Sequence, residues 1–119
     1  MGIPLLTVVE TSTFARRAEQ LLSIEEYEDL ILYLALHPES GDIVPGTGGL
    51  RKVRFAAKGR GKSGGIRAIY YFFDADNPLY ALLLYGKNEQ SDLTPKQKKE
   101  AAAFVARIKA VARMRRVEL

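Results

Sequence analysis

The sequence predicts a small α+β domain whose elements follow the order strand, helix, helix, strand, strand, strand, helix. Three observations predict it. Apolar residues recur at helical spacing towards both ends of the chain, they alternate with a period of two in the middle, and capping residues stand where helices should begin. The chain of 119 residues has the length of one domain, and we expect a single domain at residues 1–119. Its content of 47% apolar residues excludes a wholly disordered chain.

The first part of the chain predicts one strand and two helices. An apolar run at residues 5–10 has the length of a short strand, and hydroxyl-bearing residues follow it as caps for a helix that ends near Leu22. Ser23 and Glu26 have the spacing of a capping box, which begins the second helix. That helix should end near His37, because a proline follows and disfavours helical backbone at the residue before it.

The middle of the chain predicts three strands. Residues 38–49 are a loop by composition, and from Leu50 onwards apolar and basic side chains alternate as they do in a half-buried strand. A basic, glycine-rich hairpin loop occupies residues 58–65. Two further strands, Ile66–Asp74 and Leu79–Lys87, are rich in aromatic and branched residues, and the second is nearly continuously apolar, as expected inside a sheet.

The last part of the chain predicts a long helix. Thr94 and Gln97 form a second capping box, with proline at the first helical position, where it is favoured. Apolar residues then follow at the spacing of one helix face. They are Ala101, Phe104, Val105, Ile108 and Ala112.

Composition also limits the location and the chemistry. The sequence has no cysteine and one histidine, which excludes disulfides and thiolate zinc sites. No run approaches the ~18 apolar residues of a membrane span. The first residues lack the basic segment and cleavage site of a signal peptide. We therefore expect a cytoplasmic protein with no membrane partner, no metal and no cofactor.

Basic residues are concentrated in the middle of the sequence. The net charge is +4, but residues 1–42 carry eight acids and two bases, whereas residues 43–73 carry seven bases and no acid. Residues 74–119 carry nine bases and six acids. An uncompensated basic segment favours a polyanionic partner, most commonly nucleic acid, over a solvated surface with an accidental bias.

Five polar residues of the predicted strands should meet on one surface. Lys52 and Arg54 share a strand face, Arg67 begins the next strand across a hairpin, and Lys87 closes the last strand with Tyr85 two residues earlier. A sheet face that meets solvent is also polar, but solvated faces usually mix charges. This face holds no acid among its strand residues, so the sequence favours a phosphate-binding cleft.

Two phrases of the sequence resemble a known family. GGLRKVRFAAKGRGKSGGIRAIYYFF (48–73) and LLLYGKNEQSDLTPKQKKE (82–100) are similar to the RelE/HigB superfamily of bacterial toxins, in its HigB-like branch. The resemblance implies a small, mostly antiparallel sheet flanked by helices. It also implies ribosome-dependent cleavage of messenger RNA, and neutralisation by a cognate HigA- or RelB-like antitoxin that binds operator DNA.

The resemblance also suggests which residues form the site. Lys52 and Arg54 fall on the two basic positions of the family's strand, and Arg67 falls in its G-x-R-x-x-Y phrase. Lys87 matches the first of a basic pair that follows a glycine. Asparagine stands at the second position of that pair, and Thr94 stands where a tyrosine follows in RelE itself.

Cleavage of RNA by attack of its own 2′-hydroxyl needs no metal, and it assigns a task to each residue. Arg54 and Arg67 suit the negative charge that builds on the phosphorane, because a guanidinium grips two phosphate oxygens. Lys52 and Lys87 are both candidates for the base, since neighbouring cations favour the neutral amine. Tyr85 is the alternative acid or base, or else an ordinary core aromatic.

Basic residues outside this cleft should bind phosphates of RNA or of the ribosome without reading sequence. They are Arg51, Lys58, Arg60, Lys62, Lys96, Lys98 and Lys99. Two other functions remain open at the level of sequence. One is a ParE-like toxin that inhibits DNA gyrase without nuclease activity, and the other is an inactive nucleic-acid-binding module of the same fold.

Overall fold

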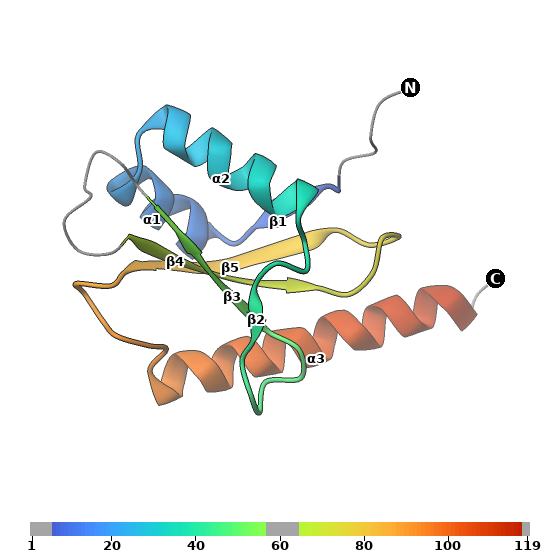
Figure 1. Ribbon diagram of the computed structural model, residues 1–119. Coiled ribbons are helices and arrows are strands. Elements are labelled where there is room, and N and C mark those ends of the chain that lie inside the picture. Colours follow the sequence, from blue (N-terminus) through green and yellow to red (C-terminus); the bar gives the residue numbers. More distant parts are fainter. Residues whose placement is uncertain (1–5, 57–64, 118–119) are drawn as a thin grey trace, which may run out of the picture.

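The computed structural model describes residues 6–56 and 65–117, which form one sheet with helices on both faces (Figure 1). Two helices cover one face and the long last helix runs across the other. In chain order the elements are β1 (Val8–Glu10), α1 (Ser12–Leu21), α2 (Ile24–Leu36), β2 (Asp42–Ile43), β3 (Arg51–Phe55), β4 (Ile66–Phe72), β5 (Leu79–Gly86) and α3 (Pro95–Val117).

The sheet is mostly antiparallel, as predicted. Its strand order is β1-β5-β4-β3-β2, and only β1 and β5 pair in parallel. Parallel strands need a long crossover connection, and the chain between β1 and β5 forms one through α1, α2 and the strands β2, β3 and β4. The last three strands are therefore neighbours, which brings the basic middle of the chain next to the end of β5.

The helices begin where the sequence predicts. The Thr11 hydroxyl accepts a hydrogen bond from the backbone of the first turn of α1. Ser23 and Glu26 form the predicted capping box, with bonds of 3.1 and 2.9 Å. Thr94 and Gln97 exchange the same two kinds of bond at the start of α3, at 2.9 and 3.1 Å. These local bonds satisfy backbone N–H groups that have no partner inside a helix.

Several predicted bounds were wrong. The strand predicted from residue 5 begins at Val8, and the strand predicted to end at Lys87 ends at Gly86. The predicted loop 38–49 contains the short strand β2, which pairs with the start of β3, because a tertiary partner makes two otherwise loop-like residues extend. The predicted strand Ile66–Asp74 ends at Phe72 instead. The Asp74 carboxylate accepts from the backbone of the following turn at 3.0 Å, and such an Asx bond ends a strand. Most of the predicted hairpin loop 58–65 lies outside the described residues.

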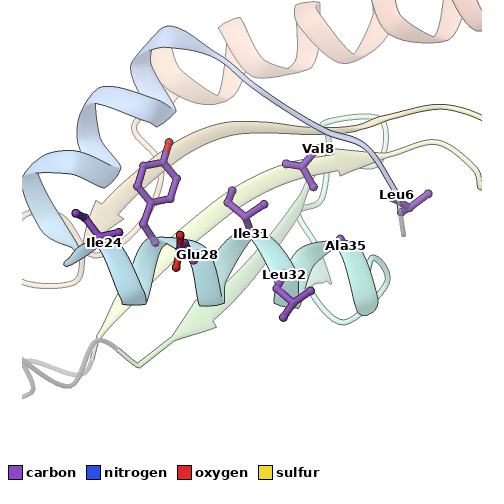
Figure 2. A pocket seen from close by; sticks show the side chains of 8 residues that line it. Leu6, Val8, Ile24, Glu28, Ile31, Leu32 and Ala35 are labelled. Atoms are coloured by element: carbon purple, nitrogen blue, oxygen red, sulfur yellow. The ribbon is translucent and has the colours of Figure 1, made fainter. Parts of the chain in front are cut away.

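The core lies on both sides of the sheet. Phe14, Leu30 and Leu34 pack from α1 and α2 against one face, and Val105 packs from α3 with Tyr85 against the other. Beside the first of these layers, a groove between α2 and the N-terminal strand opens to solvent (Figure 2). No helix within the described ranges has both the length and the apolar character needed to cross a membrane.

Candidate functional site

Three polar residues lie in register across the three central strands. Arg54 on β3 pairs with Arg67 on β4, and Arg67 pairs with Tyr85 on β5. Partners in register point their side chains to the same face, with strands about 4.8 Å apart. The structure thus brings together three of the five predicted site residues, which we call the arginine–tyrosine row.

The two predicted lysines border this row. Lys52 is two residues before Arg54 on β3, so it lies on the same face, opposite Ile69 of β4. Lys87 directly follows β5, is exposed, and donates its backbone N–H to the Gly65 carbonyl at 3.3 Å. That bond continues the pairing beside the start of β4, close to the end of the row that Tyr85 and Arg67 form.

Tyr85 is both a core aromatic and a member of the row. Its side chain is 2% exposed and packs in the cluster beneath α3. Within the described part of the chain, its hydroxyl is the only buried side-chain polar atom that lacks a hydrogen-bond partner. Burial raises the pKa of Tyr85, the Asp92 carboxylate raises it further, and the Arg67 guanidinium opposes the rise. The phenol is therefore protonated at neutral pH and has a free hydrogen-bonding capacity.

Two acids reach this face, contrary to the prediction that it holds none. One is Asp42 of β2, which pairs in register with Lys52, and the other is Asp92. The Lys52 ammonium donates to Asp92 Oδ1 at 3.2 Å. The same oxygen accepts from the Leu93 backbone at 2.8 Å, and that bond, followed by the one from Lys52, lowers the pKa of Asp92. Asp92 belongs to the connection between β5 and α3, so the alternation along the strands gave no sign of it.

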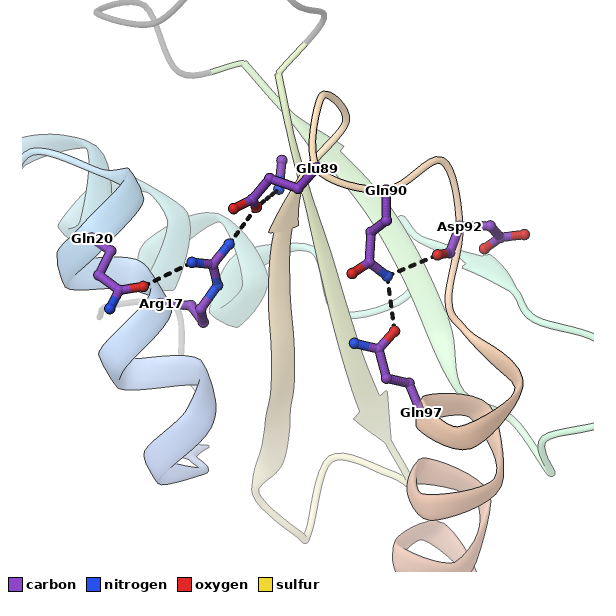
Figure 3. A network of polar contacts seen from close by, with 7 residues as sticks. Arg17, Gln20, Glu89, Gln90, Asp92 and Gln97 are labelled. Carbon is purple, nitrogen blue, oxygen red and sulfur yellow. Dashed lines mark hydrogen bonds and ion pairs between the residues drawn. The ribbon is translucent and has the colours of Figure 1, made fainter.

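Bonds to α1 and α3 hold this connection in place (Figure 3). The Glu89 carboxylate accepts from the Gly86 N–H at 2.8 Å and forms an ion pair with Arg17 of α1. The backbone bond and Arg17 lower the pKa of Glu89, against the effect of burial. On the other side, Gln90 donates to the side chain of Gln97 at 2.8 Å. The connection that carries Lys87 and Asp92 is therefore fixed at both ends.

Arg51 does not join the site. It alternates with Lys52 and so points to the opposite face of β3. Its guanidinium donates to the Glu39 and Gly41 carbonyls at 3.1 and 2.8 Å and lies 3.9 Å from the Glu39 carboxylate. These contacts give Arg51 a structural role in holding the connection between α2 and β2.

The other predicted phosphate-binding residues fall into two groups. Lys96, Lys98 and Lys99 lie in the first turns of α3, and Lys98 is close enough to Asp92 to contribute to its lowered pKa. Three more lie outside the described residues: Lys58, Arg60 and Lys62. In the described part of the chain, no three His, Asp or Glu side chains lie close enough together to hold a metal ion.

Comparisons with known proteins find a matching family for the chain and a similar fold for the structure. The family model of the RelE toxin of the RelE/RelB toxin–antitoxin system matches residues 7–118. The chain belongs to this RelE toxin family. Its fold is similar to that of Escherichia coli RelE in the free state, in a variant with two arginines replaced by alanine. The TM-score is 0.52 at 13% identity, over 74% of this chain and 90% of that one. The assignment to the HigB-like branch stays a prediction.

Proposed function

We propose that this toxin inhibits translation by cleaving messenger RNA on the ribosome. The observation that supports the proposal is the arginine–tyrosine row, with two guanidinium groups and a buried phenol in register and Lys52 beside them. RNA supplies its own nucleophile, because the 2′-hydroxyl can attack the adjacent phosphorus. The protein then has to align that attack, neutralise the phosphorane and move two protons, and none of these tasks requires a metal.

The two arginines stabilise the negative charge that develops on the phosphorane. As the bond from the 2′-oxygen to phosphorus forms, negative charge grows on the non-bridging oxygens, and the bond to the 5′-oxygen then breaks. Arg54 and Arg67 carry permanent positive charge and donate in a planar fork that matches phosphate oxygens. Their fixed places on adjacent strands mean that little reorganisation accompanies the reaction.

Tyr85 and Lys87 are the proposed acid and base. The Tyr85 phenol keeps its proton at neutral pH, and its donation to the leaving 5′-oxygen requires the buried hydroxyl to open towards the row. The Lys52 ammonium is bonded to the Asp92 carboxylate, a bond that the charged form makes, so Lys52 serves as a third cation. Lys87, at the exposed end of the row, is the remaining candidate base. Only its neutral amine has the lone pair that accepts the proton of the 2′-hydroxyl, and the products are a 2′,3′-cyclic phosphate and a 5′-hydroxyl.

The remaining basic residues suit docking rather than chemistry. Lys96 and Lys99 are exposed in the first turns of α3, where their charges oppose the helix dipole. A phosphate-rich surface such as ribosomal RNA compensates that cost without any sequence readout. This function requires a cytoplasmic location, where ribosomes carry the messenger, and a cognate antitoxin that keeps the toxin inactive.

The test is cleavage of a defined messenger in a purified translation system, with and without ribosomes. We expect cleavage only on programmed ribosomes, and the products should carry 2′,3′-cyclic phosphate and 5′-hydroxyl ends. A chelator should not change the rate as long as the ribosomes remain intact. Equal cutting of free RNA would contradict ribosome dependence. Intact messenger together with inhibited DNA gyrase would replace the proposal by the ParE-like function, and no effect in either assay would leave an inactive binding module.

A further inference from the structure

An apolar groove lies on the side of the molecule away from the arginine–tyrosine row. It runs between α2 and the N-terminal strand and has a volume of about 560 Å³. The residues that line it are Leu6, Val8, Ile24, Tyr27, Glu28, Ile31, Leu32 and Ala35. Figure 2 shows labelled side chains of this lining along α2 and, on the N-terminal segment, at Leu6 and Val8.

Two apolar side chains in this groove are open to water, and most of the others are partly buried against the core. Ile24 is 79% exposed and Leu32 is 47% exposed, and they lie eight residues apart on one face of the same helix. Scattered exposed apolar residues are common, but a groove lined by several of them marks a surface that another molecule covers. A helix with apolar residues at i, i+3, i+4 and i+7 is the occupant that such a groove accepts.

The charge around the groove selects a basic occupant. The helix α2 carries four acids and no base: Glu25, Glu26, Glu28 and Asp29. Glu28 itself lines the groove. Such a surface repels RNA and attracts lysine and arginine side chains. The occupant is therefore a protein segment, with apolar residues for the groove and basic residues for its rim.

The groove and the site belong to opposite faces of the sheet. The helix α2 packs with α1 on one face, whereas Tyr85 lies in the cluster beneath α3 on the other. A segment that fills the groove consequently leaves the arginine–tyrosine row uncovered. Membership of a toxin–antitoxin family supplies one protein that must bind this chain tightly, and that protein is the antitoxin.

We propose that the groove between α2 and β1 is a docking site for an amphipathic, basic-flanked helical segment of the antitoxin. The inference rests on the family's antitoxin and not on the proposed nuclease chemistry. Binding in this groove anchors the antitoxin from behind the sheet, so inhibition of the toxin has to come from the remainder of the antitoxin.

The decisive variant is Ile24→Glu in the full chain, titrated with the purified antitoxin encoded beside the toxin gene. Ile24 is the first residue of α2, where an acid is favourable to the helix, so the variant should fold. Removing the burial of one isoleucine should weaken antitoxin binding by about ten-fold or more. Val111→Glu is the matched control, because Val111 is 50% exposed on α3, and it should bind as the wild type does.

A charge reversal tests the basic character of the segment. Glu28→Lys should weaken binding of the same antitoxin by several-fold at low salt, with a smaller loss at high salt. Messenger cleavage is measured in parallel, and both variants should cleave at the wild-type rate. If the wild-type toxin does not cleave messenger RNA, the proposed function is wrong but the docking site is unaffected. Wild-type antitoxin affinity in Ile24→Glu, equal losses in Val111→Glu, or a groove that instead drives self-association of the toxin alone would overturn the docking proposal.

Discussion

The hydroxyl of Tyr85 should lower the stability of the fold, and it is also the group proposed to donate a proton in the reaction. Its hydroxyl is buried without a partner, and leaving such a group unsatisfied costs about 1–3 kcal/mol. Tyr70 is buried on the other face of the sheet, and its hydroxyl has a hydrogen-bond partner, since it accepts the Gly41 N–H at 2.9 Å. The two tyrosines therefore separate the effect of an unsatisfied hydroxyl from that of a satisfied one.

Tyr85→Phe should stabilise the fold and reduce cleavage. Removing the unsatisfied hydroxyl should raise the free energy of unfolding by roughly 1 kcal/mol, while messenger cleavage loses its proton donor and falls by roughly 10²-fold. Urea unfolding and single-turnover cleavage on programmed ribosomes measure the two effects. Tyr70→Phe is the control and should lower the free energy of unfolding. A Tyr85→Phe protein with wild-type cleavage would assign Tyr85 to the core alone.

Arg67 is the residue whose loss should affect cleavage most. It lies at the centre of the row, between Arg54 and Tyr85. Arg67→Ala should lower the single-turnover rate by roughly 10²–10³-fold, or about 3–4 kcal/mol, because one preorganised contact to the phosphorane disappears. Arg16→Ala, which removes an exposed arginine of α1, should keep the wild-type rate. Equal small losses in both variants would reduce the row to a docking surface.

At the scale of elements, the connection between β5 and α3 determines the arrangement of the site. It carries Lys87 and Asp92, and its Glu89 is bonded both to Gly86 at the end of β5 and to Arg17 of α1. The bonds to Glu89 are made by its charged form, which is why its pKa lies below the ordinary value of 4.5. We therefore expect the stability of this segment to depend on pH.

Acid should loosen the connection through Glu89. A carboxylate with a lowered pKa in the folded state stabilises the fold above its unfolded value, and that contribution disappears as the pH falls through the folded value. The free energy of unfolding should therefore fall below pH 4.5, and Glu89→Gln should show a smaller fall. Urea unfolding from about pH 7 to about pH 3 measures this.

Gln20→Ala is the control for this experiment. It removes the other hydrogen-bond partner of Arg17 but no titratable group, so it should keep the pH dependence of the wild type. A Glu89→Gln protein with the full wild-type dependence would assign the acid sensitivity to other carboxylates, of which Asp92 also has a lowered pKa.

The whole molecule separates its charges between its two faces. Residues 1–42, which include the acidic helix α2, carry eight acids and two bases, and the chain from residue 43 to 73 carries seven bases and no acid. The sheet separates described segments of these two ranges, since α2 covers one face and Arg54 and Arg67 lie on the other, whereas Arg51 points towards the face of α2. One molecule thus presents an anionic apolar surface and a cationic polar surface at the same time.

Binding to ribosomes should weaken steeply with salt. If about five or six phosphates are contacted, the slope of log affinity against log salt should be about −4 to −5. Filter binding or sedimentation with vacant ribosomes between low and high salt measures it. Arg67→Ala should make the slope shallower by about one contact, whereas a flat response in the wild type would contradict an electrostatic interface.

The sequence by itself determined the features that depend on neighbours along the chain. Ser23 with Glu26 and Thr94 with Gln97 define helix starts because a cap needs only residues three apart. The alternation at Lys52 and Arg54 likewise defined a cationic strand face, because side chains of a strand alternate whatever the fold.

Only the tertiary structure decided what meets that face. Asp92 lies forty residues from Lys52 along the chain and Glu89 lies seventy-two from Arg17, and no local pattern indicates contacts at such separations. The strand order decided that Arg54, Arg67 and Tyr85 stand in one row, and packing beneath α3 decided that the phenol is buried without a partner. The physical reason is that caps and alternation follow from backbone geometry over a few residues, whereas ion pairs, register and burial follow from how distant segments pack together.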